Sequence, residues 1–562
     1  MPKSPKRSFK NPKNWIALGI VVIALGFFIQ GKNDRSFFEV SKNLEIYANV
    51  LKELNTYYVD EIEPGKLTKV GIDAMLDDLD PYTNYITESD IEGYEFMTTG
   101  RYGGIGATMR RKDDQVYIGD VYENSPSQKA GLRPGDLLIS IDNEQIKGRG
   151  VDDISSLLKG SPGTQVSLKV KDALTGEEVV KLITRGEIEL SSVPYAGLVG
   201  PDKNIAFVRL TQFTPNCGRL VRDALDSLKT AKPDMKGVVL DLRNNPGGLL
   251  DEAVNVCNIF TERGQLVVST KGKMKDWDKD FKTEGPAWDT KIPLTVLVNR
   301  HSASASEIVA GTMQDLDRGV IIGERTYGKG LVQTTRPLGY NARLKLTTAR
   351  YYTPSGRCIQ ALDYAHRHAD GSVGRIPDSL KQSYKTKGGR LVKGGGGVDV
   401  DVEVKDPVTS RLAITLYSKN FLFDYATIYQ RKHKAPTDAT TFALSTPDWN
   451  EFTKWLDTKD YSYKTATEIG LDSLQQTAIR EKYYDAAKSE FAALRTKVGH
   501  DKKMDLVKNQ AEVKEMLESE IISRYYYLKG RIANSLQYDL ELTKAISILN
   551  APTNYSALLE KK

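Results

Sequence analysis

Two segments of the sequence carry residue types that can form a nucleophile and its base. Ser304 is followed three residues later by Glu307, which is the spacing of a capping box, so we expect Ser304 at a helix N-cap. Lys329 lies between Gly328 and Gly330. A neutral lysine amine can activate a serine hydroxyl. At a helix start, unpaired N–H groups and the positive end of the helix dipole would stabilise an oxyanion beside that serine.

The hydrophobic pattern indicates which elements position these residues. The apolar runs 296–298 and 320–322 each predict a short buried strand, and the pattern between them predicts a helix. Residues 331–335 are again predicted to be extended, which would place Lys329 and Gln333 on the same face of a strand. The sequence therefore predicts that a strand–helix–strand unit holds the serine and the lysine.

Other interpretations of the same residues are possible. The segment from Gly323 to Lys329 matches the phosphate-loop pattern G-x-x-x-x-G-K, but Gly330 stands where Ser or Thr would bind magnesium, so we reject that reading. Without catalysis, Ser304 would be only a helix cap and Lys329 only a solvated lysine. His301 suggests a Ser-His pair, but no matching acid is evident, and we regard His301 as a bystander.

These segments resemble those of a known family. The strings N-R-H-S-A-S-A-S-E-I and Y-G-K-G-L-V-Q are similar to those of the carboxyl-terminal processing peptidases, also called tail-specific proteases. The resemblance implies that Ser304 is the nucleophile, that Lys329 is the general base and that Gln333 orients the lysine. One departure is His301, which stands where the family usually has glycine.

A third string, D-L-R-N-N-P-G-G, follows a predicted buried strand and precedes a predicted helix. It also resembles the family, and the resemblance implies that Gly247 or Gly248 donates a backbone N–H to an oxyanion hole. The second donor would be the N–H of Ala305. We interpret Asp241 and Arg243, in the same string, as structural residues.

Residues 97–188 resemble a PDZ domain. The resemblance lies in the strings Y-G-G-I-G and S-P-S-Q-K-A-G-L-R-P-G-D, with strands predicted at 116–121, 137–141 and 166–170 and a helix at 151–158. In a PDZ domain, backbone N–H groups of a glycine-rich loop bind a peptide's terminal carboxylate, and the peptide adds as a strand to the sheet edge. The residues that the resemblance assigns to this role are Gly103, Gly104, Ile105 and Gly106, with Ile105 lining the pocket.

Length and composition exclude several classes of function. A chain of 562 residues is too long for one core, and its ordinary composition predicts that most of it folds. A net charge of +6 is small for this length and gives no indication of nucleic-acid binding. The three cysteines match no metal-ligand spacing and form no disulfide framework. The Ser/Lys chemistry implies neither a metal nor an organic cofactor.

The N-terminal residues include a segment that is predicted to enter a membrane. A basic flank precedes an uncharged, mostly apolar run at residues 15–29, which is either a signal peptide or a short membrane anchor. No A-x-A cleavage site follows the run, which favours an uncleaved anchor. The basic flank should remain cytoplasmic, so the catalytic part would lie on the periplasmic or extracellular side.

We expect a multidomain α/β protein: a layered α/β peptidase core with an inserted PDZ-like, β-rich domain and flanking helical segments. The segments are a basic flank and signal-anchor (1–30), an N-terminal helical arm (31–96), the PDZ-like domain (97–188), the peptidase core (189–405) and a C-terminal helical region (406–562). Within the core, strands are predicted at 205–210, 238–242, 266–268 and 294–298, and residues 363–398 are predicted to be a surface loop or insertion.

The sequence is compatible with more than one role for each of the two helical segments. The arm has an apolar stripe from Val40 to Leu54, which either joins subunits into a homo-oligomer, as often in the family, or packs on its own core. The C-terminal region resembles nothing that we recognise and would be a scaffold, an assembly surface or a lid. Its predicted helical stripe comprises Met516, Ile521, Tyr525 and Leu528.

Together these features predict an exported serine endopeptidase that cuts proteins near their C-termini. Its substrates would be proteins or peptides with free C-termini, which the PDZ domain would recognise. The alternative is a catalytically silent, membrane-anchored PDZ scaffold. That alternative predicts a broken dyad, whereas Ser304, Lys329, Gln333 and both glycines are present.

Overall fold

The computed structural model describes residues 37–405, 407–499 and 501–560, and these form two compact units that divide after Tyr85. The predicted membrane segment, residues 15–29, lies outside the described residues. Within the described ranges, no helix combines the length and the apolar character that crossing a membrane requires.

The first unit contains a helix over residues 37–57 and α2 (Pro64–Asp77). The two helices touch where a Cβ on Gly71 would lie 2.8 Å from the hydroxyl of Tyr47. Most of the predicted stripe remains exposed, including Val40 and Leu44. The stripe therefore does not form a core of its own within this unit.

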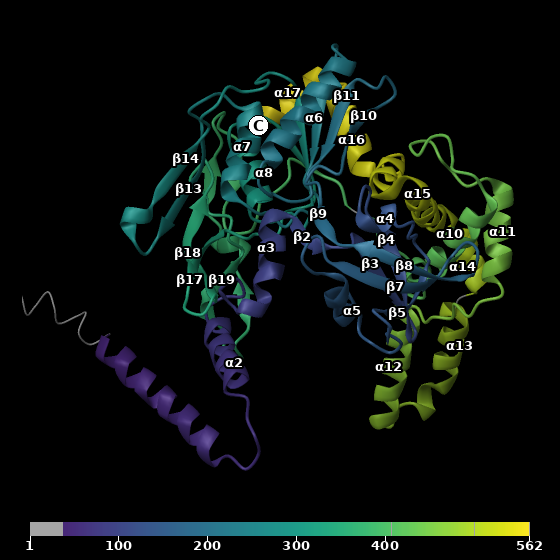
Figure 1. The fold of residues 1–562 in the computed structure, drawn as a ribbon. Helices are drawn as coiled ribbons and strands as arrows, with labels where there is room; N and C mark the ends of the chain where they lie inside the picture. The colour runs from purple at the N-terminus through teal and green to yellow at the C-terminus, as the bar shows by residue number, and fades with distance from the viewer. Residues whose placement is uncertain (1–36, 406, 500, 561–562) are drawn as a thin grey trace, which may run out of the picture. The chain divides into compact units, whose positions relative to one another are not determined.

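The second unit begins with a PDZ-like domain built on one antiparallel sheet (Figure 1). Its strands, in sheet order, are β3 (Ala107–Lys112), β4 (Gln115–Val121), β5 (Leu137–Ile141), β7 (Gln165–Lys171) and β8 (Glu178–Thr184). Alternate residues of β7 are buried, as expected for a sheet with one face on a core. Helix α5 (Val151–Leu158) covers this core through Ile154 and Leu158. The predicted strands and helix of this domain are confirmed.

The α/β core is a six-stranded sheet, and its four central strands are buried almost throughout. In order, the strands are β10 (Tyr195–Val199), β11 (Ile205–Arg209), β12 (Gly237–Asp241), β15 (Leu294–Val298), β16 (Val320–Gly323) and β23 (Val402–Glu403). Only β10 runs antiparallel to its neighbour. The near-continuous apolar runs of β12 and β15 are typical of parallel strands covered on both sides.

Two sets of helices cover this sheet. On one face pack α6 (Cys217–Ala231), α7 (Leu250–Phe260) and α8 (Ala305–Asp315). On the other face, Leu542, Ala545 and Ile548 of α16 (Leu540–Leu549) pack against β11, β12, β15 and β16, and α17 (Pro552–Leu559) lies beside them. The last two helices of the C-terminal region, α16 and α17, therefore form one layer of the α/β core (Figure 1).

A second, antiparallel sheet lies beside the core. It includes β13 (Leu266–Gly272), β14 (Lys279–Lys282), β17 (Leu331–Pro337) and β18 (Arg343–Tyr352). The predicted strand 266–268 therefore belongs to this sheet and not to the central one. The segment 363–398 is predicted to be a surface loop or insertion. It includes most of two short hairpins, β19–β20 (Leu362–Arg367, Val373–Arg375) and β21–β22 (Ser383–Lys385, Leu391–Lys393).

The remaining C-terminal residues form a helical domain with its own core of aromatic and aliphatic side chains. Its helices are α9 (Arg411–Ser418), α10 (Phe421–Lys432), α11 (Thr446–Leu456), α12 (Ala466–Arg480), α13 (Lys488–Val498), α14 (Lys502–Lys508) and α15 (Gln510–Ser535). Most of the predicted stripe on α15 packs inward, but Leu528 is 49% exposed. Tyr527 has non-helical angles (φ 54°, ψ −157°), and this break rotates Leu528 away from the stripe.

Candidate active site

Three loops meet at the carboxyl ends of adjacent parallel strands. Strand β12 lies beside β15, with Asp241 opposite Leu297, and β15 lies beside β16, with Val298 opposite Gly323. The carboxyl ends of parallel strands share one edge of the sheet, which is where α/β proteins place their sites. The register of the sheet therefore brings together the loops that carry the predicted oxyanion glycines, Ser304 and Lys329.

Ser304 occupies a strained turn between β15 and α8. Its backbone angles, φ 56° and ψ −114°, are uncommon for a residue with a side chain. Such strain persists only where the surroundings enforce it, and it concentrates at functional sites. Ala303 and Ala305 on either side are buried, whereas Ser304 is partly exposed. The turn thus leaves the serine within reach of a substrate.

The carboxylate of Glu307 holds this turn to the lysine loop. Its Oε2 accepts from the N–H of Ser304 at 2.9 Å and from the N–H of Lys329 at 2.8 Å. Its Oε1 accepts from the N–H of Gly328 at 2.7 Å and from the hydroxyl of Thr326 at 2.6 Å. Glu307 is fully buried. One oxygen is therefore bonded to the backbone of both predicted catalytic residues.

Glu307 is expected to make stability depend on pH. Burial raises the pKa of Glu307 to about 7 from 4.5, although its four hydrogen bonds lower it. Because the folded-state pKa lies above the unfolded value, the ionised carboxylate costs stability, fully so above pH ~7 and not at all below ~4.5. We expect wild type to lose about 3 kcal/mol relative to Glu307→Gln as pH rises through this window, measured by urea unfolding. Parallel stability curves for the two proteins would contradict this expectation.

The loop that carries Gly247 and Gly248 approaches Ser304 so closely that only glycine fits at position 247. A Cβ on Gly247 (φ 100°) would lie 2.8 Å from the Cβ of Ser304 and 2.9 Å from the nitrogen of Ala305. The N–H of Gly247 is already bonded to the side chain of Asn245 at 2.9 Å. In the part of the chain that is described, the N–H groups of Gly248 and Ala305 have no protein acceptor. Of the two predicted glycines, Gly248 is therefore the better placed donor.

Lys329 lies in the loop before β17 and is partly buried. The hydroxyl of Tyr351 donates to its backbone carbonyl. Its neighbours need to be glycine, because a Cβ on Gly328 would lie 2.4 Å from the Cβ of Ala361 and one on Gly330 would lie 2.8 Å from the nitrogen of Gln360. The lysine backbone is thus fixed on both sides.

The prediction that Lys329 and Gln333 lie on the same face of a strand is wrong. Strand β17 begins at Leu331, after the lysine, and a bulge between Val332 and Gln333 interrupts the alternation of side chains. The amide of Gln333 donates to the hydroxyl of Thr347 on β18 at 3.1 Å. A regular strand could not have been distinguished from a bulged one by the apolar pattern alone.

His301 is exposed, and its Nε2 accepts from the Nε of Arg300 at 3.3 Å. This contact directs the ring to a neighbouring surface side chain. The geometry supplies no acid for a Ser-His arrangement among the described residues near it.

The predicted carboxylate loop of the PDZ-like domain is only partly a loop. Gly103 and Gly104 end strand β2 (Arg101–Gly104), which pairs with β9 (Gly186–Glu189). Ile105 is 2% exposed and belongs to the domain core instead of lining an open pocket.

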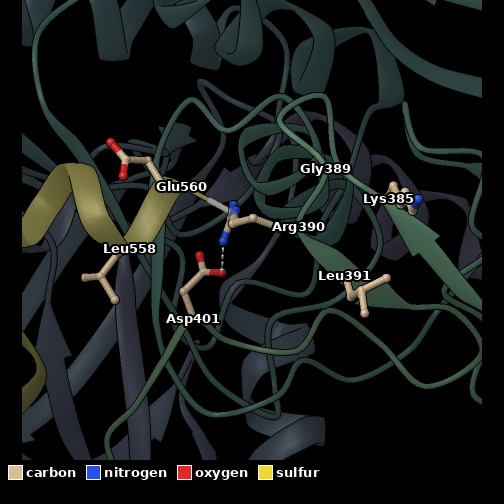
Figure 2. Close-up of a pocket in the computed structure, with 7 residues that line it drawn as sticks. All are labelled: Lys385, Gly389, Arg390, Leu391, Asp401, Leu558 and Glu560. Carbon is tan, nitrogen blue, oxygen red and sulfur yellow. Dashed lines mark hydrogen bonds and ion pairs between the residues drawn. The ribbon is translucent and has the colours of Figure 1, made fainter. Parts of the chain in front are cut away.

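A pocket of about 550 Å³ lies elsewhere, between the β21–β22 hairpin and α17 (Figure 2). Its arginine, Arg390, is already paired with Asp317 and Asp401 at 2.6 Å each. None of the predicted catalytic residues lines this pocket. Among the described residues, no cluster of side chains could hold a metal ion.

Comparison with family models divides the chain in the same order as the structure. A model described as Peptidase family S41 matches residues 204–365, and a PDZ domain model matches residues 117–172. A model described as "Probable PDZ-protease, C-terminal helical domain" matches residues 412–549, the region that resembled nothing in the sequence analysis.

Individual proteins match over much of the chain. A "Probable CtpA-like serine protease" of Staphylococcus haemolyticus (strain JCSC1435) is 29% identical over 490 residues, which is 84% of this chain and 88% of that protein. A protein of the same description from Staphylococcus aureus (strain MRSA252) is 35% identical over 348 residues, 61% of this chain and 68% of its own. A solved photosystem II D1 C-terminal processing protease is 27% identical, covering 64% of this chain and 92% of its own, with a TM-score of 0.35.

Proposed function

Because the chain belongs to the S41 family of serine peptidases, among the CtpA-like proteases with a PDZ domain, we propose that it is an endopeptidase with Ser304 as nucleophile and Lys329 as general base. The observation that carries this proposal is the Glu307 carboxylate, whose Oε2 accepts from the N–H groups of both residues. The buried clamp fixes the two backbones beside each other, as a dyad requires.

In the proposed reaction, the Ser304 hydroxyl attacks the scissile carbonyl and its proton passes to the amine of Lys329. The N–H groups of Gly248 and Ala305 stabilise the oxyanion of the tetrahedral intermediate. Lys329 then gives the proton to the leaving amine, and the C–N bond breaks to leave an acyl-enzyme. Lys329 then takes a proton from a water molecule that attacks the ester carbonyl, and it returns this proton to the Ser304 oxygen as the C–O bond breaks and the acid product leaves. The Gln333 side-chain amide donates its N–H to Thr347, and its oxygen would accept from the lysine amine without adding a charge that would hold it protonated.

The function is tested by incubating the chain without residues 1–36 with an unstructured protein, and identifying the products by mass spectrometry. We expect wild type to release C-terminal fragments and Ser304→Ala to release none. Binding of substrate without cleavage by wild type would favour the silent scaffold instead.

We propose further that the PDZ-like domain selects substrates by their C-terminal tail. Strand β3 is an edge strand of its sheet and contacts α5, so a peptide can add to the part of the edge before Arg111, whose backbone carbonyl already accepts from the Asn420 amide. The terminal carboxylate would meet the backbone turn at Ile105 and Gly106, where the chain leaves β2. Both residues lie immediately before β3.

Amidating the C-terminus of a peptide substrate is expected to lower kcat/KM by about tenfold or more, because hydrogen bonds to a charged group contribute ~1.5–3 kcal/mol. The measurement compares free-acid and amidated forms of one fluorogenic peptide. Acetylating the N-terminus of the same peptide is the control and should have little effect. Equal cleavage of the free acid and the amide would rule out recognition of the tail carboxylate.

Location and assembly are proposals of their own. The apolar run 15–29 supports an exported protein anchored in the cytoplasmic membrane. The exposed apolar side chains of the helix over residues 37–57 suit packing against a second copy of the chain. N-terminal sequencing of the native protein tests the anchor, and a start near residue 27 would contradict it. The mass of the protein in detergent tests the assembly, and a monomer would contradict it.

A further inference from the structure

The loop that carries the oxyanion glycines is tied to the C-terminal helices by a buried cluster of charges. The guanidinium of Arg243 donates to Asp539 at 3.0 and 2.6 Å, and it also donates to Glu541. On its other side it donates to Asp241 at 2.9 and 2.8 Å. Three carboxylates, two of them from the start of α16, therefore orient one arginine four residues before Gly247.

The cluster is shielded from water. Arg243 is 12% exposed, Asp539 is 11% exposed and Glu541 is 6% exposed. Burial alone would raise the pKa of Asp241, but the Arg243 guanidinium holds that pKa below its usual range. The charges of Asp539 and Glu541 therefore act on Arg243 with little screening, and removing one would change the balance of forces on its side chain.

The residues that follow Arg243 are hydrogen-bonded directly to the loop between β15 and α8, which carries Ser304. The next residue, Asn244, donates its backbone N–H to the side chain of Asn299 at 3.0 Å, and the Asn299 amide donates back to Asn244 at 3.1 Å. The backbone carbonyl of Asn245 accepts from the N–H of Ala303 at 3.0 Å. A shift of Arg243 would thus move the segment that bears Gly248 relative to Ser304.

We propose that Asp539 and Glu541 are positioning residues for catalysis, which act through Arg243 to hold the oxyanion loop in register with the nucleophile. The start of α16 would then support catalysis in addition to packing against the central sheet. This inference rests on the proposed peptidase function. Alignment of the oxyanion donors matters most in the transition state. Under this inference, that alignment depends on residues that are far from Ser304 in the sequence.

The test uses substitutions that remove charge but keep shape. Asp539→Asn preserves the N-cap of α16, because an asparagine oxygen can still accept from the N–H of Leu542, now at 2.8 Å. Glu541→Gln is the second substitution, and the two are also combined. The matched control is Tyr555→Phe, which removes hydrogen bonds between α17 and the backbone of Leu294, at the other end of β15.

We expect kcat for a short fluorogenic peptide to fall at least tenfold in Asp539→Asn and further in the double variant, with KM within twofold of wild type. The affinity for a peptide boronate, which mimics the tetrahedral state, should fall in the same proportion as kcat. Tyr555→Phe should keep both values near wild type. Thermal unfolding establishes that each variant is folded at the assay temperature.

Two results would overturn the inference: a folded Asp539→Asn variant with wild-type kcat, or an equal loss of kcat in Tyr555→Phe, which would indicate general loosening of the core. Should the double variant fail to fold, the single Asp539→Asn variant decides. A wild-type protein that cleaves nothing would instead contradict the proposed function, so the two failures are distinguishable.

Discussion

Replacing Lys329 with arginine is expected to abolish peptide hydrolysis while the protein stays folded. Arginine remains protonated under all conditions in which proteins fold, so it cannot accept the proton of Ser304. We expect kcat/KM to fall by about 10³-fold or more, as when a dyad member is removed. The measurement is the initial rate on a fluorogenic peptide, with the unfolding temperature as a check on folding.

Lys291→Arg is a suitable control, because Lys291 is an exposed loop lysine outside the three loops of the site. It should retain wild-type activity. If Lys329→Arg kept more than about a tenth of wild-type activity, the lysine could not be the general base.

The second large effect is expected at Gly247. In Gly247→Ala, the new methyl group would lie 2.7 Å from the carbonyl oxygen of Ala303 and 2.8 Å from the Cβ of Ser304, so one of the two loops must move. Displacing an oxyanion donor typically costs ~10²–10³ in kcat, and we expect a loss of that size. Steady-state kinetics on the same peptide measure it.

Gly264→Ala separates the steric effect from backbone strain. Gly264 also has a positive φ, 83°, but a Cβ there would have nothing within 4 Å. We expect this control to lose some stability and to keep its kcat. Equal kcat for Gly247→Ala and wild type would remove the oxyanion loop from the proposed mechanism.

The strands that place the site could be predicted from the sequence because their signals are local. Strand β15 is a short apolar run, and the turn after it carries the serine cluster. The spacing of Ser304 and Glu307 also predicted the bond from the Ser304 N–H to the Glu307 carboxylate, which the structure contains at 2.9 Å. Each of these features depends on residues only a few positions apart.

The contacts that complete the site could not be predicted in this way. Glu307 reaches the N–H of Lys329 only because β15 and β16 are neighbours in register, which no local pattern specifies. Arg243 meets Asp539 across 296 positions of the chain. Similarly, nothing in the apolar stripe of α15 signals the break at Tyr527, since an aromatic residue is not a helix breaker.

The central claim, that Ser304 and Lys329 act as one catalytic unit, is tested most directly by a double-mutant cycle. Turnover of one peptide is measured for wild type, Ser304→Ala, Lys329→Ala and the double variant, all shown to be folded. We predict that each single substitution abolishes turnover and that the double variant is no worse than either. Substantial turnover by Lys329→Ala, or a double variant whose loss is the product of the two single losses, would contradict the dyad.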